Sequence, residues 1–459
     1  MPVTYRKTLR PTWAVVAAAL ALAPTPAVAQ TLSEALAAAY LGNPDLESAR
    51  AGLRGTDEEV PQALSSWRPN VTMSSSYGSR RIETFPNGAA DTDVHNLPRT
   101  FGVEIEQPLF RGFRTEAETR RAKNRVAAAR ARLVVKEQEV LLDAVEAYLD
   151  VLRTEQILQL RRENEDGLAR QLEATRDRFR VGELTRTDVS QAESRYAQAT
   201  AQRQAAEGDV SIARANYAKF IGSPPGTLVQ PGIPSQLPAD LQTTLRDART
   251  NNPNVVAVEF DERSARDNID LVFGELLPTL SATAAFDYDR DLVGADTGRR
   301  QRSLLAELTV PLYEGGDVYS RVREAKHGAS EALATLAEAK REIDRIATNA
   351  WESYASNRAR IVSFEAQVQA QTVALEGVEQ EQRVGSRSIL DVLDAERELV
   401  DARIQLVGAQ RDSLAAAYAV IQAIGRLTAR DLGLPVPVYD MTENYERVKD
   451  KWIGTDIAK

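Results

Sequence analysis

The chain lacks cysteine and is poor in histidine and aromatic residues. Its 459 residues include no Cys and two His, and Phe, Trp and Tyr together make up 6%. The absence of Cys excludes disulfides, thiolate metal sites, thiol nucleophiles and lipid-modified cysteine. Neither His95 nor His327 stands in a cluster of possible ligands. The sequence therefore predicts no metal site and no cofactor.

Nucleotide and catalytic motifs are also missing. The sequence has no phosphate-binding glycine loop, and no nucleophile is visibly paired with a base. Asp and Glu abound, but on helices such residues mostly form solvated faces. A hydrolase is accordingly the weakest of the functional classes considered, and we expect no enzymatic activity.

Beyond the N-terminus no apolar run is long enough for a transmembrane helix. Residues 1–29 have the features of a cleavable export signal: Arg6, Lys7 and Arg10 precede a short apolar core, and Ala27-Val-Ala29 fits a cleavage site. An uncleaved anchor helix is the alternative, but spanning a bilayer takes about 20 apolar residues. Removal of the signal would take away three positive charges and change the net charge from -9 to -12. An acidic exported chain is not expected to bind nucleic acid.

The chain contains its own middle section twice. Three glycines recur 203 residues further on, and the short motifs around them repeat, as in Gln107-Pro-Leu-Phe-Arg-Gly112 and Val310-Pro-Leu-Tyr-Glu-Gly315. The repeated pairs are Gly112 and Gly315, Gly182 and Gly385, and Gly222 and Gly425. Upstream the offset is 209, where Asn43-Pro44 and Pro69 match Asn252-Pro253 and Pro278. Such duplication indicates a built scaffold more than a catalytic pocket.

Proline is absent between Gly112 and Gly182 and again between Gly315 and Gly385. Apolar residues there follow three, four and seven spacings, which predicts very long amphipathic helices. A helix over Phe113–Arg180 would be about 100 Å long at ~1.5 Å per residue. We expect the shorter helices Thr187–Ile221 and Leu46–Ser66, with Asn43 and Asn252 as N-caps, to complete antiparallel coiled-coil pairs. A free-standing periplasmic coiled coil fits the helices equally well.

Short alternating segments separate these two possibilities. Strands are predicted over about 70–80, 100–108, 279–289 and 303–311, each with one apolar and one polar face and Leu305 as the exception. Strands of about ten residues fit a tilted transmembrane β-strand, although a soluble four-stranded sheet would show the same alternation. Four strands cannot close a lumen alone and lipid does not tolerate open edges, so several copies would share one barrel. The linkers Ile82–Arg99 and Arg290–Arg302 are expected to be exposed loops.

These features resemble the TolC family of outer-membrane efflux proteins. The resemblance lies in the duplication, in the strand ends Pro108 to Gly112 and Pro311 to Gly315, and in the turn Arg383-Val-Gly-Ser-Arg-Ser-Ile-Leu-Asp-Val-Leu-Asp-Ala395. It implies a mainly α-helical chain with a small transmembrane β part, which forms a homotrimer. Twelve strands would close an outer-membrane β-barrel, and twelve helical strands would form a coiled-coil periplasmic tunnel. The C-terminal tail is most similar to members that serve type I protein secretion.

The domain organisation follows from the repeat. We expect a signal peptide at 1–29, a first structural repeat at 30–222, a linker at 223–239, a second repeat at 240–425 and a C-terminal equatorial tail at 426–459. The hairpin turns between the long helices would form the far tip of the tunnel. There Gly182 and Gly385 are predicted to be left-handed caps.

Charges present in only one copy of the turn are the candidate gate. Asp188 and Asp391 fit capping boxes with Thr185 and Ser388, so they could be caps and nothing else. Asp394 and Arg387 have no such explanation, because their counterparts are Gln191 and Leu184. Asp391 and Asp394 lie three residues apart on one helix face and would form two acidic rings in a trimer.

The resemblance adds a latch and one departure from it. It implies that Arg387 bonds to the pair Thr187 and Asp188, and that a Tyr three residues before the turn glycine completes the gate. This chain has Gln382 at that position, which puts an equivalent latch in question. The expected function is an outer-membrane exit duct that works with a periplasmic adaptor (membrane fusion protein) and an inner-membrane ABC transporter or proton-driven pump, within outer-membrane lipid. The alternative is a periplasmic adaptor or scaffold that never enters the membrane.

Overall fold

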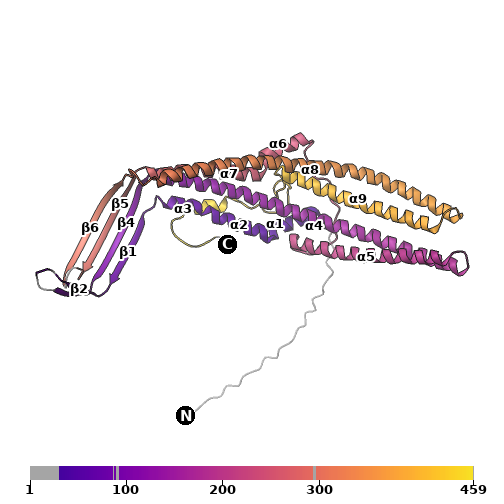
Figure 1. Ribbon diagram of the computed structural model, residues 1–459, viewed down its shortest axis with the longest axis horizontal. Coiled ribbons are helices and arrows are strands. Elements are labelled where there is room, and N and C mark those ends of the chain that lie inside the picture. The colour runs from indigo at the N-terminus through magenta and orange to yellow at the C-terminus, as the bar shows by residue number, and fades with distance from the viewer. Residues whose placement is uncertain (1–29, 86, 89–91, 293–295, 458–459) are drawn as a thin grey trace, which may run out of the picture.

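The computed structural model describes residues 30–85, 87–88, 92–292 and 296–457. The predicted export signal and its cleavage site lie outside these residues. The molecule is elongated, with a small sheet at one end and long helices along the rest (Figure 1). Among the described helices, none combines the length and apolarity needed to cross a membrane.

The two repeat units have the same order of long elements. The first unit contains α1 (Leu32–Gly42), α2 (Pro44–Asp57), α3 (Glu59–Ser65), β1 (Asn70–Tyr77), β4 (Arg99–Arg111), α4 (Arg114–Arg180) and α5 (Arg186–Ile221). The second contains α6 (Leu241–Asn251), α7 (Pro253–Phe273), the 3-10 turn η1 (Gly274–Leu276), β5 (Thr279–Arg290), β6 (Gly298–Thr309), α8 (Asp317–Arg383) and α9 (Ile389–Ala423). A short helix, α10 (Glu443–Val448), lies in the tail.

The predicted long helices are confirmed with small changes at their ends. α4 and α8 each have 67 residues, which corresponds to about 100 Å. Phe113 was expected to begin the first of them but has a left-handed φ of 59° and lies just outside it. Asn43 and Asn252 cap α2 and α7 through their side chains, with Pro in the first turn of each helix.

The helix predicted over Leu46–Ser66 is broken in two. α2 ends at Asp57 and α3 begins at Glu59. Pro61 explains the break, because it has no N–H to donate to the Asp57 carbonyl and its ring crowds that carbonyl. At the matching position of the second unit, 209 residues later, stands Asp270, and α7 continues without interruption to Phe273.

The four longer strands form one antiparallel sheet in the order β1-β4-β5-β6. The two units therefore join through β4 and β5, which pair from Arg99 opposite Arg290 to Arg111 opposite Thr279. The register places most apolar residues of the four strands on one face and most polar residues on the other, with Leu305 on the polar face opposite Thr283. This agrees with the predicted alternation.

The loop predicted over Ile82–Arg99 is partly wrong. It contains a two-stranded hairpin of β2 (Arg80–Thr84) and β3 (Thr92–Asn96) at the end of the sheet away from the helices. Arg81 bridges the two strands by binding the Asp93 carboxylate at 2.7 and 3.0 Å. The second linker is also shorter than expected, because β6 already begins at Gly298.

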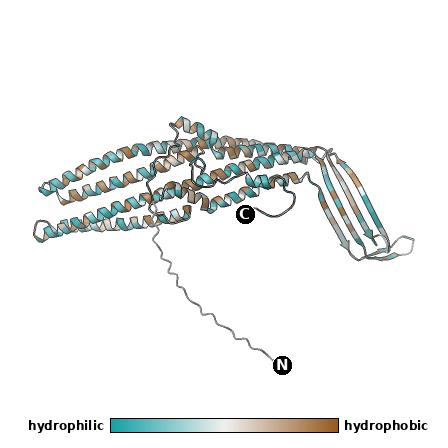
Figure 2. Ribbon diagram, turned by 180° about the vertical axis from the view of Figure 1, so that it is seen from behind, coloured by the Kyte–Doolittle hydropathy of each residue, from teal (hydrophilic) through white to brown (hydrophobic). Residues whose placement is uncertain are grey.

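Helix packing gives the molecule two layers along its length. Near the sheet α7 packs against both α4 and α8, whereas toward the tips α4 packs against α5 and α9. Hydrophobic and hydrophilic residues are interspersed along the long helices (Figure 2). The main core lies between these regions, where α1, α2, α4, α5, α9 and the tail meet around the fully buried Tyr148 and Tyr217.

Candidate gate at the helical tips

The two hairpin turns are closed by the same local interactions. Gly182 and Gly385 adopt positive φ values of 84° and 80°, as predicted for left-handed caps. The Asp188 carboxylate accepts hydrogen bonds from Thr185 at 2.9 and 2.8 Å, and the Asp391 carboxylate accepts equivalent bonds from Ser388. These hydrogen bonds hold the pKa of Asp391 below its ordinary value. Both predicted capping boxes are present.

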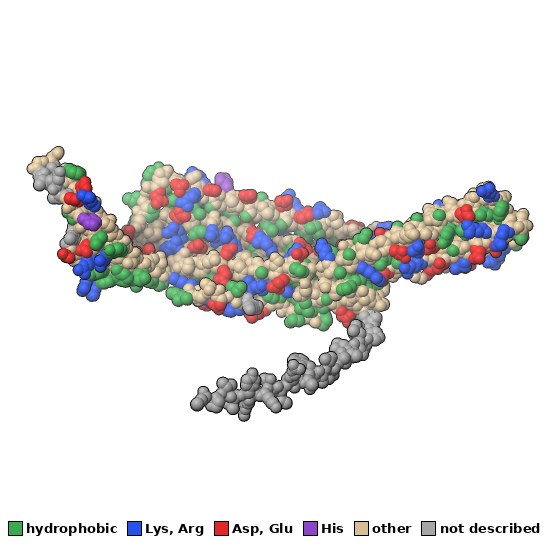
Figure 3. Space-filling model, turned by 90° about the horizontal axis from the view of Figure 1, so that it is seen from below, with side chains coloured by type: hydrophobic (Ala, Val, Ile, Leu, Met, Phe, Trp, Pro, Cys, Tyr) green, Lys and Arg blue, Asp and Glu red, His purple; other side chains and the backbone are tan. Residues whose placement is uncertain are grey.

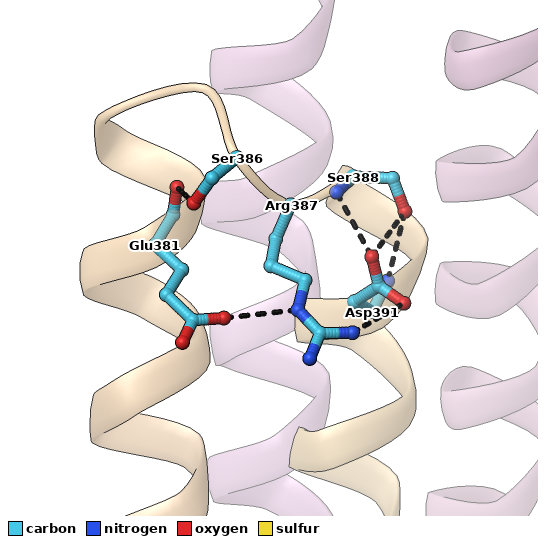
Figure 4. Close-up of polar contacts among 5 residues, drawn as sticks. All are labelled: Glu381, Ser386, Arg387, Ser388 and Asp391. Atoms are coloured by element: carbon cyan, nitrogen blue, oxygen red, sulfur yellow. Dashed lines mark hydrogen bonds and ion pairs between the residues drawn. The ribbon is translucent and has the colours of Figure 1, made fainter.

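Arg387 lies between two carboxylates of its own turn. Its guanidinium donates to Glu381 at 2.9 Å and approaches Asp391 at 3.9 Å (Figure 4). The pKa of Arg387 is raised by Glu381 and, less strongly, by Asp391. Within the single chain, Arg387 therefore has partners other than Thr187 and Asp188. Thr187 is exposed, and Gln382 is half-buried with its carbonyl accepting from the Gly385 N–H.

Asp394 is held by a residue that the sequence reasoning missed. Arg195 on α5 donates to its carboxylate at 2.8 Å and thereby joins the two hairpins. The counterpart of Arg195 in the second unit is Glu398, so here too the charge differs between the copies. This opposite charge at matching positions could have marked Arg195 as a candidate site residue from the sequence. It did not identify Asp394 as its partner.

Ion pairs cross the first hairpin at four places along its length. The pairs between α4 and α5 are Glu155–Arg214 at 2.7 Å, Arg162–Glu207 at 3.2 Å, Glu165–Arg203 at 2.5 Å and Arg176–Glu193 at 2.6 Å. The corresponding positions of the second hairpin are Arg358 and Ala417, Glu365 and Gln410, Val368 and Leu406, and Glu379 and Glu396. Within the described residues no ion pair joins α8 to α9. The second hairpin thus lacks the ionic cross-links of the first, and the side-chain hydrogen bond that joins its two helices runs from Gln371 to Glu398 at 3.2 Å.

One of these replaced pairs brings two acids together. Glu396 has a carboxylate oxygen that is buried without a hydrogen-bond partner among the described residues. Burial raises the pKa of Glu396, the charge of Glu379 raises it further, and Arg170 on α4 lowers it. An ionised Glu396 therefore destabilises the packing of α9 at this level.

The strand-to-helix junctions differ between the units. Gly112 has a φ of 62°, and a Cβ there would lie 2.3 Å from the Gly274 carbonyl oxygen, whereas Gly315 at 66° faces open space. β4 has a register irregularity between Pro108 and Phe110, and Pro311 follows the end of β6. In the part of the chain that the structure describes, no three His, Asp or Glu side chains are placed to hold a metal ion.

Long helical hairpins that carry a small sheet with one apolar face define a membrane-anchored helical duct. The family model described as outer membrane efflux protein matches residues 35–223 and 244–426, the two repeat units. The chain belongs to this family. It is an outer-membrane exit channel of an export system and extends from the outer membrane into the periplasm. This assignment decides against an adaptor that never enters the membrane.

Individual relatives support the assignment over nearly the whole length. The chain is 36% identical over 429 residues to the outer membrane efflux protein BepC of Brucella suis, covering 93% of this chain and 92% of that one. It is 26% identical over 426 residues to the outer membrane protein TolC of Vibrio cholerae, covering 91% and 95%. The Campylobacter jejuni CmeC outer membrane channel has the same fold, with a TM-score of 0.77 at 15% identity and coverage of 91% and 89%.

Proposed function

We propose that three copies of the chain form a passive duct whose periplasmic tip is opened through the second hairpin. The observation that carries this proposal is the difference in ion pairing: four pairs cross the first hairpin, and none among the described residues crosses the second. Three four-stranded sheets would close one twelve-stranded barrel, since sheet edges are not tolerated in lipid. The duct would carry out no chemistry of its own.

In this trimer Arg387 would leave its own turn and bind Asp188 of a neighbouring chain. Its present partner Glu381 is exposed and Asp391 is half-buried, so exchange of one carboxylate for another requires little rearrangement. The contacts would hold the tip shut, with Thr187 beside Asp188 and Gln382 in place of a tyrosine. Opening would then unwind α9 from α8.

The latch is tested by single-channel conductance in a planar bilayer. Arg387→Ala and Asp188→Asn should each raise the conductance or open time of the trimer, because each removes one side of the contact. Arg383→Ala is the matched control, since Arg383 lies at the same tip and contacts Glu379 of its own helix at 3.8 Å. Wild-type conductance in both latch variants would contradict the proposed contact.

Asp391 and Asp394 would form two acidic rings where the tip is narrowest. Rings of carboxylates attract cations and select against anions in a pore. The double variant Asp391→Ala with Asp394→Ala should weaken block by multivalent cations. Since Asp394 also binds Arg195, the variant Arg195→Gln separates the effects: it breaks the same bridge and keeps both carboxylates. Undiminished block in the double variant would place the cation site elsewhere.

Cargo and partners are proposed from the family and the tail. We infer that a periplasmic adaptor and an inner-membrane transporter supply the energy and that secreted proteins or small molecules pass through the duct. The tail favours a type I secretion partner. Purification of the assembled complex and identification of its inner-membrane component tests this: recovery of a proton-driven pump alone would exclude the type I assignment.

A further inference from the structure

Charge on the sheet is divided between its two faces. The polar face carries five acids and two basic residues, Arg299 and, at the helix end, Arg111; the acids are Glu104, Glu106, Asp287, Asp289 and Glu307. On the apolar face the described strands carry no acid and four arginines, namely Arg99, Arg290, Arg300 and Arg302. Lys and Arg side chains gather toward the end of the sheet away from the helices (Figure 3).

The four arginines occupy one end of the apolar face and continue an aromatic row. Arg300 lies opposite Tyr288, and Arg302 lies opposite Phe286. Their guanidinium groups stack over these rings at 5.6 and 6.0 Å, and Arg99 stacks over Tyr77 at 5.3 Å. Toward the helices the same face continues with apolar residues such as Leu304, Leu308 and Ile105. Aromatic residues followed by arginines mark the level where the acyl chains end.

The arginines have no anionic partner among the described residues. All four are exposed, and Arg99, Arg300 and Arg302 stack on aromatic rings. Arg99 lies directly opposite Arg290 in the register, and like charges in such positions repel. A neighbouring chain that pairs with β6 through β1 brings no acid, since β1 reads Asn-Val-Thr-Met-Ser-Ser-Ser-Tyr. An external anion would relieve this repulsion.

We propose that these four arginines form a girdle that binds the anionic phosphates of lipids in the outer, cell-surface leaflet. This inference rests on the proposed trimeric barrel, because barrel closure turns the apolar face toward lipid. The helices extend into the periplasm, so the far end of the sheet lies at the cell surface. Guanidinium groups bind phosphate oxygens in a bidentate manner and tolerate stacking on aromatic rings, which suits this position.

The test compares lipid binding to the purified full-length protein by native mass spectrometry. The probes are phosphatidylglycerol and phosphatidylcholine with identical acyl chains, so that the preference measures headgroup charge alone. We expect a preference for phosphatidylglycerol that falls about fivefold for each arginine removed, as in Arg300→Gln with Arg302→Gln. Arg299→Gln is the control for the opposite face, because it removes one positive charge from the polar face of the same strand and should leave the preference unchanged.

Two results would overturn the proposal: an unchanged preference in the double variant, or a loss in Arg299→Gln as large as the loss for one arginine of the girdle. If the double variant failed to assemble, the lipid preference of the wild-type protein would be measured at low and high salt. A preference that does not change with salt would exclude binding through exposed charges. Trimer mass and planar-bilayer conductance are recorded for the same samples. A wild-type protein with neither a trimer mass nor channel conductance would refute the proposed function. A conducting trimer without lipid preference would refute the arginine girdle alone.

Discussion

Replacing Glu379 by arginine should close the second hairpin more tightly. In the first hairpin the equivalent positions hold the pair Arg176–Glu193, at 2.6 Å, whereas Glu379 and Glu396 repel each other. Glu379→Arg would restore the missing pair. An exposed cross-helix ion pair contributes about 0.2–1 kcal/mol, and a like-charge pair costs a similar amount. The gain is reduced by the loss of the Glu379–Arg383 contact, which is long and exposed.

The net effect is about 1 kcal/mol per chain and, for three chains that open together, about 3 kcal/mol. Since each 1.4 kcal/mol is a factor of about ten, the ratio of open to closed channels should fall by roughly a hundredfold. The assay is the open fraction in a planar bilayer. Arg176→Glu is the reciprocal control, because it creates an acid pair in the first hairpin and should loosen the tip. A wild-type open fraction in folded Glu379→Arg channels would refute the argument that ionic cross-links hold the hairpin.

Three further predictions follow from the same contacts. Ionised Glu396 destabilises the hairpin at pH values above its raised pKa, and this penalty disappears as the pH falls toward the ordinary pKa of a glutamate. Glu396→Gln should therefore slow hydrogen exchange in the first turns of α9 at neutral pH. The variant should also flatten the pH dependence of that exchange. Gly112→Ala should lower the unfolding temperature far more than Gly315→Ala. Both glycines have positive φ, but only a Cβ at Gly112 would clash with the Gly274 carbonyl. Equal falls in unfolding temperature would assign the whole effect to backbone strain. Arg195→Ala should raise the open fraction by freeing the second hairpin from α5, and a fall instead would show that the bridge favours the open state.

Local signals in the sequence predicted the helices closely. The turn glycines and capping boxes lie within a few residues of the ends that they determine, so α5 was predicted to begin one residue after its observed start at Arg186. The break at Pro61 was also local, and its missing N–H could have been read from the sequence. The single helix predicted over Leu46–Ser66 followed the second unit, where Asp270 stands at the matching position and α7 is unbroken.

Contacts between distant segments could not be predicted in the same way. β2 and β3 have five residues each and lie in a segment rich in turn residues, so the sequence shows no long alternation there. Arg81 and Asp93 reinforce the pairing across the loop. Arg195 and Asp394 lie 199 residues apart, and their pairing requires α5 and α9 to come together near the tip. Differences between the copies identified Asp394 as unusual, whereas only the fold identifies its partner.

The positions of the bridges between the two hairpins define where opening can pivot. α9 is joined to the first unit by Asp394 with Arg195 at 2.8 Å, by Asp401 with Arg161 at 3.8 Å and by Arg411 with Asp150 at 2.8 Å. Arg411 is the least exposed member of the three α9 groups and lies farthest from the tip turn. A motion that begins at the turn must break the first bridge and strain the long second one, while the third can persist. We therefore expect α9 to bend between Asp401 and Arg411, so that the tip opens while the packing around Tyr418 and the tail stays closed.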